Sequence, residues 1–316
     1  MLNQTEPNSN ALFEILENQE TDVLRVVFHS GFGTLLLYRP LMQALAEQNL
    51  GTVVGVAVLD FQKYLQNNPE TLIADLADDY AQRLANSGYQ KFQLIGHCMG
   101  GLIAAEVGTR LQKRNLTVEN LVLIDAFPTF YAVKEPLIEE AVSLTALGLD
   151  FEKAGLKAVS NAEFGMALYS AFENSHCQEV PAPIENYLGD SEADRKVKAM
   201  ISQMRSQSME QRYASYAEKA GVPVENVAGT IATYTQATKG AMTEIHPCSL
   251  DVRFIRAKDF YYFIPGVDDK AIALWQKQCS GRFDLYEVEG DHFGCITMPS
   301  GIQKVAEIAR EGCHAE

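Results

Sequence analysis

The chain has 316 residues, 47% of them hydrophobic, which suits one large domain with an insertion or two smaller domains. Its formal net charge is −15 and its pI is near 4.9, so nucleic acid and anionic membranes, which would both repel it, are excluded as general partners. No apolar stretch reaches the roughly 18 residues of a membrane span, and residues 1–10 lack the basic and apolar parts of a signal peptide.

The cysteines show no paired or C-x-x-C spacing; they are Cys98, Cys177, Cys248, Cys279, Cys295 and Cys313. In a chain of this length, that pattern predicts neither a zinc site nor a disulfide framework. Together with the absence of a signal peptide, it leads us to expect a cytoplasmic protein with reduced thiols.

Apolar runs alternate with stretches of helical periodicity, after a polar segment at residues 1–21 that suits a linker or an edge element. Strands are predicted at residues 23–28, 52–59, 89–95, 121–124, 250–255 and 283–288. Helices are predicted at residues 38–48, 71–87, 102–111, 269–279 and 300–310. Strands that are apolar throughout and alternate with helices predict an α/β fold, with a mostly parallel central sheet flanked by helices.

The alternation stops over residues 129–248. This segment has helical stretches at residues 164–173 and 200–220, and no strong buried strand. We therefore predict a core formed by residues 22–128 and 249–316, interrupted by an all-helical insertion. An insertion of that length between strands of one sheet is usually functional.

The most informative motif is GHCMGG at residues 96–101, between a predicted strand and a predicted helix. Strand, G-x-nucleophile-x-G and helix form the nucleophile elbow of an α/β-hydrolase, here with Cys98 where serine is usual. The two flanking glycines, Gly96 and Gly100, remove side chains that would clash in this tight turn. We expect the positive end of the helix dipole to lower the pKa of the Cys98 thiol.

A thiol nucleophile needs a base and an acid that orients the base. Of the histidines, only His292 lies in the loop after the last predicted strand, where this fold supplies its base. We expect a structural role for His97, because neighbours on the elbow project differently, and His29 ends the first strand. The others lie in the insertion, at its edge or in the tail; they are His176, His246 and His314.

Two acids compete for the third position. Asp125 follows the strand after the elbow helix, and Asp259 follows the next strand, where many α/β-hydrolases place their acid. The oxyanion hole should combine the backbone N–H of Met99 with one from the loop after the first strand, at Gly31 or Phe32.

Several segments resemble thioesterase domains of nonribosomal peptide and polyketide synthetases. GHCMGGLIAAEV at residues 96–107 is similar to the family's elbow and following helix, usually GHSxGG with an A-x-E pair. FHSGFG at residues 28–33 and YRPL at residues 38–41 resemble its oxyanion loop and first helix. GDHF at residues 290–293 resembles its G-x-H motif, and the strand ending at Asp125 resembles the one that carries its acid, which favours Asp125 over Asp259.

The resemblance implies a thioesterase that releases an acyl or peptidyl chain, by hydrolysis or by cyclisation to a lactone or lactam, in antibiotic or other secondary-metabolite biosynthesis. The partner would be an acyl- or peptidyl-carrier protein that presents a small-molecule acyl group on phosphopantetheine. No cofactor or metal of its own is implied, and the helical insertion would correspond to the lid. Cys98 departs from the family's serine.

Other interpretations remain open. The chain could be a stand-alone editing thioesterase, or a cysteine-dependent esterase or lactone hydrolase such as the dienelactone hydrolases, which this elbow also resembles. A non-enzymatic α/β-hydrolase-like protein that binds a ligand is the alternative from another class. Cys295 could pack beneath the loop that carries His292 or act as a redox partner of Cys98.

Overall fold

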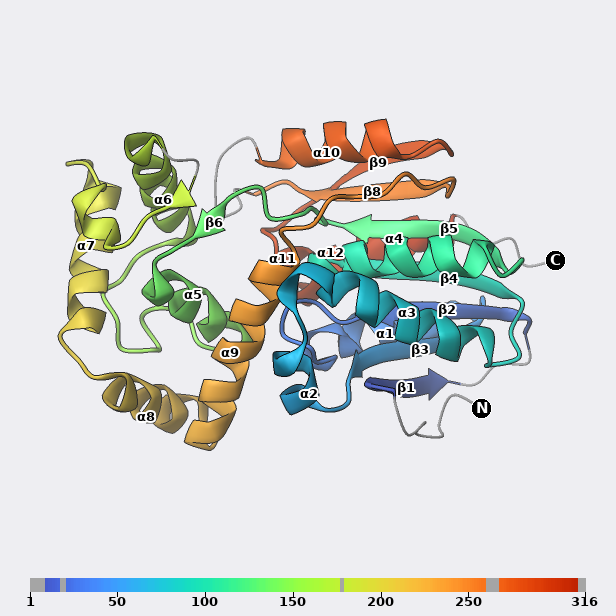
Figure 1. The fold of residues 1–316 in the computed structure, drawn as a ribbon, viewed down its shortest axis with the longest axis horizontal. Coiled ribbons are helices and arrows are strands. Elements are labelled where there is room, and N and C mark those ends of the chain that lie inside the picture. The colour runs from blue at the N-terminus through green and yellow to red at the C-terminus, as the bar shows by residue number, and fades with distance from the viewer. Residues whose placement is uncertain (1–8, 18–20, 177–178, 260–266, 312–316) are drawn as a thin grey trace. The chain divides into compact units, whose positions relative to one another are not determined.

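The computed structural model describes residues 9–17, 21–176, 179–259 and 267–311 (Figure 1). These residues form two compact units. One unit contains residues 9–17, 21–128, 243–259 and 268–311, and the other contains residues 129–176, 179–242 and 267. The division into a core of residues 22–128 and 249–316 and a helical insertion of residues 129–248 stays a prediction.

The first unit is built on a seven-stranded sheet with the order β1-β3-β2-β4-β5-β8-β9. Its strands are β1 Ala11–Glu17, β2 Val23–Phe28, β3 Thr52–Val58, β4 Lys91–His97, β5 Thr117–Ile124, β8 Val252–Ala257 and β9 Phe283–Val288. β1 pairs with β3 in the antiparallel direction, and the other pairs are parallel. The predicted mostly parallel sheet is confirmed. The polar N-terminal segment supplies the edge strand β1.

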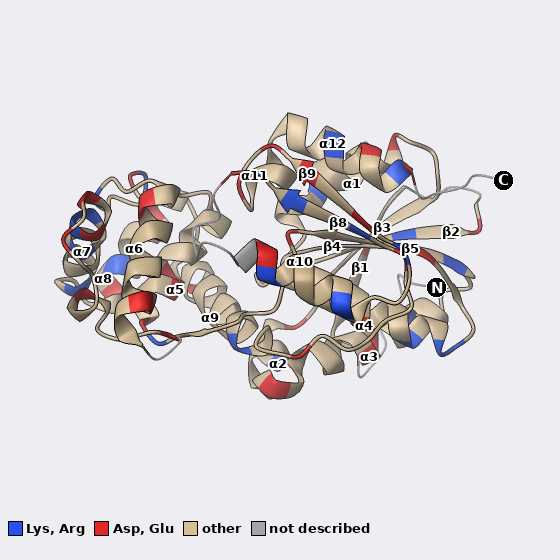
Figure 2. Ribbon diagram, turned by 90° about the horizontal axis from the view of Figure 1, so that it is seen from above, with Lys and Arg blue, Asp and Glu red and all other residues tan. Residues whose placement is uncertain are grey.

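Helices cover both faces of this sheet (Figure 2). They are α1 Arg39–Ala46, α2 Phe61–Gln66, α3 Leu72–Ala85, α4 Met99–Gln112, α10 Val267–Gln278, α11 Gly294–Thr297 and α12 Pro299–Arg310. α1 and α12 pack together on one face and share a core with apolar side chains of β2, β3, β4, β5, β8 and β9. α3 and α4 pack together on the opposite face.

Burial follows the pattern that predicted these elements. All residues of β2 and β3 are buried, as expected for strands covered on both faces. The four-residue spacing that predicted α3 places its apolar side chains against the core; Leu72, Leu76, Tyr80 and Leu84 are all buried.

The second unit is helical, apart from a pair of two-residue parallel strands, β6 Ala132–Val133 and β7 Glu179–Val180. Its helices are α5 Pro136–Ser143, α6 Asn161–Ser175, α7 Glu192–Arg205, α8 Met209–Ala220 and α9 Val224–Gly240. A buried ion pair between Arg212 and Glu140 (2.6 Å) joins α8 to α5.

The single helical stretch predicted at residues 200–220 is wrong, because α7 ends at Arg205 and a new helix begins at Met209. Ser208 caps α8 by accepting the backbone N–H of Gln211, whose side chain bonds back to the cap. This capping box stabilises a separate helix start where apolar periodicity alone suggests continuity.

The glycines of the elbow are required by close backbone contact. A Cβ at Gly96 would lie 2.2 Å from the carbonyl oxygen of Gly100, and a Cβ at Gly100 would lie 2.6 Å from that of His29. Real Cβ atoms do not approach carbonyl oxygens this closely, so β2, β4 and the start of α4 would have to separate.

We therefore expect Gly96→Ala to lower the free energy of unfolding by about 3 kcal/mol, from overpacking against fixed backbone. Urea unfolding of the 316-residue chain measures it. Gly229→Ala in α9 is the matched control, since a Cβ there meets nothing within 4 Å. It should be neutral or stabilise the protein by up to about 1 kcal/mol. Equal effects of the two substitutions would contradict the steric explanation.

Candidate active site

Cys98 lies on the sharp turn between β4 and α4. Its backbone has φ 56° and ψ −132°, a conformation that non-glycine residues rarely adopt. Two backbone hydrogen bonds hold the turn. The Cys98 N–H donates to the Ile124 carbonyl oxygen (3.0 Å), and the Gly101 N–H donates to the Cys98 carbonyl oxygen (3.0 Å). The residue is partly exposed. The predicted elbow geometry is thus present, with the thiol at its tip.

His292 and Asp125 are joined by a short hydrogen bond, 2.6 Å from the imidazole Nδ1 to the carboxylate Oδ2. Both side chains are buried. Asp125 follows β5 with φ 46°, and its backbone N–H donates to Ile255 (2.7 Å). The structure therefore brings Asp125 to His292, whereas the competing Asp259 is exposed.

Burial sets the protonation of this pair. It raises the pKa of Asp125 to about 6 and lowers the pKa of His292 to about 3. At neutral pH the carboxylate is therefore ionised and the imidazole is neutral. Because the carboxylate can only accept, Nδ1 carries the ring proton and Nε2 has the lone pair. This is the protonation state that a general base requires.

The expectation that the Cys98 thiol has a lowered pKa is wrong. Although the residue is partly exposed, desolvation of its thiol and the charge of Asp125 together raise the pKa of Cys98 to about 12. Hydrogen bonds from backbone N–H groups of Met99 and Gly31 oppose the shift without overcoming it. The resting sulfur is a neutral thiol that needs a base before it can attack.

The same two amides are the predicted oxyanion donors. Met99 begins α4, Gly31 follows β2, and both direct an N–H toward the Cys98 sulfur. Of the two loop residues considered, Gly31 is the one whose amide faces the thiol. The Phe32 ring is buried and stacks on Phe293, with ring centroids 6.1 Å apart.

Two side chains hydrogen-bond to the backbone carbonyl of His292 and so hold the loop that carries it. His97 Nε2 lies 2.7 Å from the His292 carbonyl oxygen, and the Cys295 thiol donates to the same oxygen (3.3 Å). Because a carbonyl only accepts, His97 Nδ1 is unprotonated and accepts the Tyr38 hydroxyl (2.9 Å). Tyr38 ends the short 3₁₀ helix Leu36–Tyr38 directly before α1. Sequence reasoning missed it, because no local pattern links it to His97.

Other predicted features fall outside this cluster. Cys98 and Cys295 are both free thiols, so no disulfide joins them in this structure. Cys177, Cys313 and His314 lie outside the described residues. Within the described part of the chain, no group of three or more His, Cys, Asp or Glu is arranged to hold a metal ion. The helices described there include none long and apolar enough to cross a membrane.

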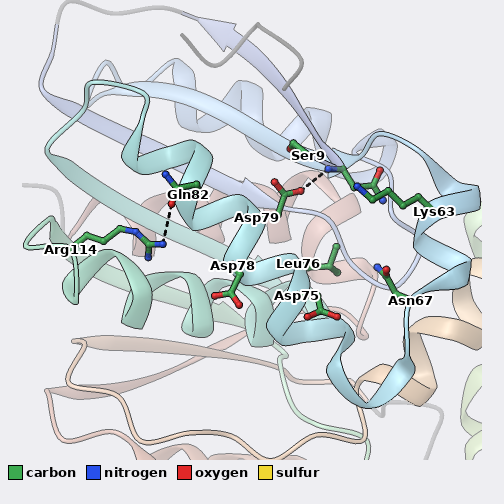
Figure 3. A pocket seen from close by; sticks show the side chains of 10 residues that line it. Ser9, Lys63, Asn67, Asp75, Leu76, Asp78, Asp79, Gln82 and Arg114 are labelled. Atoms are coloured by element: carbon green, nitrogen blue, oxygen red, sulfur yellow. Dashed lines mark hydrogen bonds between the residues drawn. The ribbon is translucent and has the colours of Figure 1, made fainter. Parts of the chain in front are cut away.

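A separate surface pocket of about 480 Å³ lies beside α3 (Figure 3). Three acidic side chains of that helix line it: Asp75, Asp78 and Asp79. The Asp79 carboxylate accepts the Asn10 backbone N–H (2.6 Å), which ties α3 to the residue before β1. None of the predicted site residues contributes to this pocket.

This fold and site define an α/β-hydrolase, and comparison with known proteins specifies the family. The model of the thioesterase domain family matches residues 26–312, so the chain belongs to that family. Pyochelin synthetase PchF of Pseudomonas aeruginosa, in strains PAO1 and UCBPP-PA14, is 27% identical over 274 residues, which cover 87% of this chain. The chain spans about 14% of the length of these relatives.

Solved structures agree with the fold. The Vlm2 thioesterase domain superposes with a TM-score of 0.58 at 14% identity, covering 98% of this chain and 100% of that one. The NocB thioesterase domain, in covalent complex with a fluorophosphonate nocardicin G analogue, gives 0.58 at 14% identity over 96% and 99%. AB3403, a four-domain nonribosomal peptide synthetase, gives 0.60 at 16% identity, covering 97% of this chain and 20% of that one.

The raised thiol pKa predicts how Cys98 reacts with iodoacetamide. Since only the thiolate is alkylated, the rate should be low at pH 7 and rise roughly tenfold per pH unit up to about pH 9. Mass spectrometry of the modified peptide measures it, with Cys98→Ala as the background control. A rate that is already maximal near pH 6 would indicate a thiolate–imidazolium pair and contradict this assignment.

Proposed function

We propose that this chain releases an acyl or peptidyl group from the phosphopantetheine thioester of a carrier protein through a covalent Cys98 intermediate. The observation that carries the proposal is the buried 2.6 Å Asp125–His292 bond, in a site where the Asp125 charge and two backbone amides act on the Cys98 sulfur. Those parts are what acyl transfer to a thiol requires.

In the first half of the proposed reaction, His292 Nε2 takes the Cys98 proton as the sulfur attacks the thioester carbonyl. The Asp125 carboxylate stabilises the imidazolium that forms. The N–H groups of Met99 and Gly31 stabilise the tetrahedral oxyanion. Its collapse breaks the carbon–sulfur bond to pantetheine, which leaves as a thiol with the proton from His292.

In the second half, His292 takes a proton from water or from a hydroxyl or amine of the acyl chain itself. The oxygen or nitrogen attacks the acyl-enzyme, and Cys98 leaves with the proton returned by His292. Water gives a free acid, and an internal nucleophile gives a lactone or lactam.

The sulfur gives this scheme a specific energetic character. Exchange of one thioester for another is nearly isoenergetic, whereas transfer to serine gives a more stable oxoester. A Cys98 acyl-enzyme would therefore stay activated for ring closure.

A carrier-protein partner is supported by the comparisons. The chain resembles part of pyochelin synthetase PchF and a region of the four-domain synthetase AB3403. We propose that it receives its acyl group from a carrier domain, in the same chain or in another.

The pKa of Asp125 predicts an acid limb in the activity profile. The pKa of about 6 leaves the carboxyl protonated, and unable to stabilise the imidazolium, below that pH. We expect kcat/KM to fall about tenfold per pH unit below about pH 6. Asp125→Asn should lower kcat/KM by roughly a thousandfold or more. Asp259→Asn should leave the profile unchanged, and a displaced acid limb in that variant would make Asp259 the acid instead.

The acyl-enzyme is tested by intact-protein mass spectrometry after incubation with acyl-loaded carrier protein. The wild-type chain should gain one acyl mass, which Cys98→Ala abolishes and which maps to Cys98. Cys98→Ser should form a longer-lived adduct and shift products from cyclised toward hydrolysed. No adduct in the wild type, together with stoichiometric retention of acyl ligand, would favour the binding protein over the enzyme. Identical products and rates for Cys98→Ser would make the sulfur incidental.

A further inference from the structure

His29 follows β2 directly, two residues before Gly31, and is fully buried. No step of the proposed reaction uses it. Its Nδ1 lies 2.7 Å from the Ser30 carbonyl oxygen, and its Nε2 lies 2.9 Å from the Tyr80 hydroxyl. Tyr80 comes from α3 and is also buried. Burying an imidazole is unfavourable unless its nitrogens are hydrogen-bonded, and here the backbone carbonyl and the phenol satisfy both nitrogens.

The partners determine where the ring proton lies. The Ser30 carbonyl can only accept, so Nδ1 carries the proton and donates it. Nε2 must then accept the Tyr80 hydroxyl proton. Burial lowers the pKa of His29 to about 4, so the ring stays neutral and keeps this arrangement at neutral pH.

The Ser30 carbonyl, which accepts the hydrogen bond from His29, belongs to the same peptide group as the Gly31 N–H, one of the two proposed oxyanion donors. The carbonyl of Ser30 and the N–H of Gly31 share one planar unit and point in opposite directions. A donor fixed on the carbonyl therefore fixes the direction of the N–H. A hydrogen bond at the oxygen also polarises the N–H and makes it a better donor.

We propose that His29 and Tyr80 are positioning residues that aim the Gly31 N–H at the oxyanion of the reaction. His29 holds the Ser30–Gly31 peptide, and Tyr80 holds His29 in the tautomer that can donate. The inference rests on the proposed function for its catalytic consequence, whereas the orientation of the peptide is measurable without turnover.

A tyrosine–histidine pair also supports the loop that carries His292, with the roles of the two ring nitrogens exchanged. There His97 donates from Nε2 to the His292 carbonyl and accepts Tyr38 at Nδ1, at 2.7 and 2.9 Å. His29 donates from Nδ1 and accepts at Nε2. Two independent tyrosine–histidine pairs thus each fix a backbone carbonyl, one beside the base and one beside the oxyanion donor.

The Gly33 N–H also donates to the Ser30 carbonyl (3.0 Å), so the loop keeps one bond when His29 is changed. We therefore expect misorientation of the Gly31 peptide rather than collapse of the loop. Loss of one oxyanion donor costs about 100- to 1000-fold in rate, and a misaimed donor should cost about 10- to 100-fold.

The test compares two neutral replacements of His29 in the full chain. In His29→Asn the side-chain N–H₂ takes about the place of Nδ1 and can still donate to Ser30. In His29→Gln the N–H₂ takes about the place of Nε2 and cannot. The first readout is the Gly31 amide resonance in protein labelled with ¹⁵N-glycine, assigned with Gly31→Ala. The second is the rate of Cys98 acylation by octanoyl pantetheine, followed by intact mass.

We expect His29→Asn to keep the Gly31 resonance and to acylate within about threefold of wild type. His29→Gln should shift the resonance and acylate about 10- to 100-fold more slowly, at similar thermal stability. The same resonance and the same rate in both variants would overturn the proposal. If wild type is not acylated while the resonance still separates Asn from Gln, the orientation stands and the thioesterase mechanism falls.

Tyr80→Phe provides a second route should His29→Gln fail to fold. It removes the hydroxyl that holds the tautomer, so it should shift the Gly31 resonance and slow acylation by about threefold or more. Tyr64→Phe is its matched control, because the buried Tyr64 hydroxyl has no hydrogen-bond partner among the described residues. Equal behaviour of the two phenylalanine variants would contradict the role of Tyr80.

Discussion

The proposed chemistry depends on one buried hydrogen bond, between the Asp125 carboxylate and His292 Nδ1. It joins residues 167 positions apart at 2.6 Å. The bond gives the imidazole its tautomer and leaves Nε2 able to accept a proton. The parallel sheet makes the contact possible, because β4, β5 and β9 end at the same edge of the sheet, and Cys98, Asp125 and His292 follow those ends.

Burial sets the protonation state of the Cys98 sulfur. The helix N-terminus and two amides favour the thiolate of Cys98, but withdrawal from water raises its pKa to about 12. Such a thiol resembles a serine hydroxyl in needing a base at the moment of attack. The proposed mechanism thus combines a serine-type activation with a thioester intermediate, which suits release by an internal nucleophile.

Sequence patterns predicted the sheet well, because fully apolar strands and four-residue helical spacing each report one local periodicity. They failed at residues 200–220, where Ser208 starts a new helix by capping and no change in periodicity marks the break. They also reversed the direction of the Cys98 pKa shift. A helix terminus is visible in a sequence, whereas the depth of burial around a side chain is not.

The sequence by itself determined the elbow, its glycines and the candidates for base and acid, since these follow from the order of short motifs along one chain. The resemblance already favoured Asp125 over Asp259, and the tertiary structure brings the Asp125 carboxylate within 2.6 Å of His292. The sequence left Gly31 and Phe32 open as oxyanion donors, and the tertiary structure directs the Gly31 amide at the thiol. It alone revealed that Tyr38 and Tyr80 support two histidines. Such pairings join residues far apart in the chain, and their energies depend on distance and desolvation, neither of which local sequence encodes.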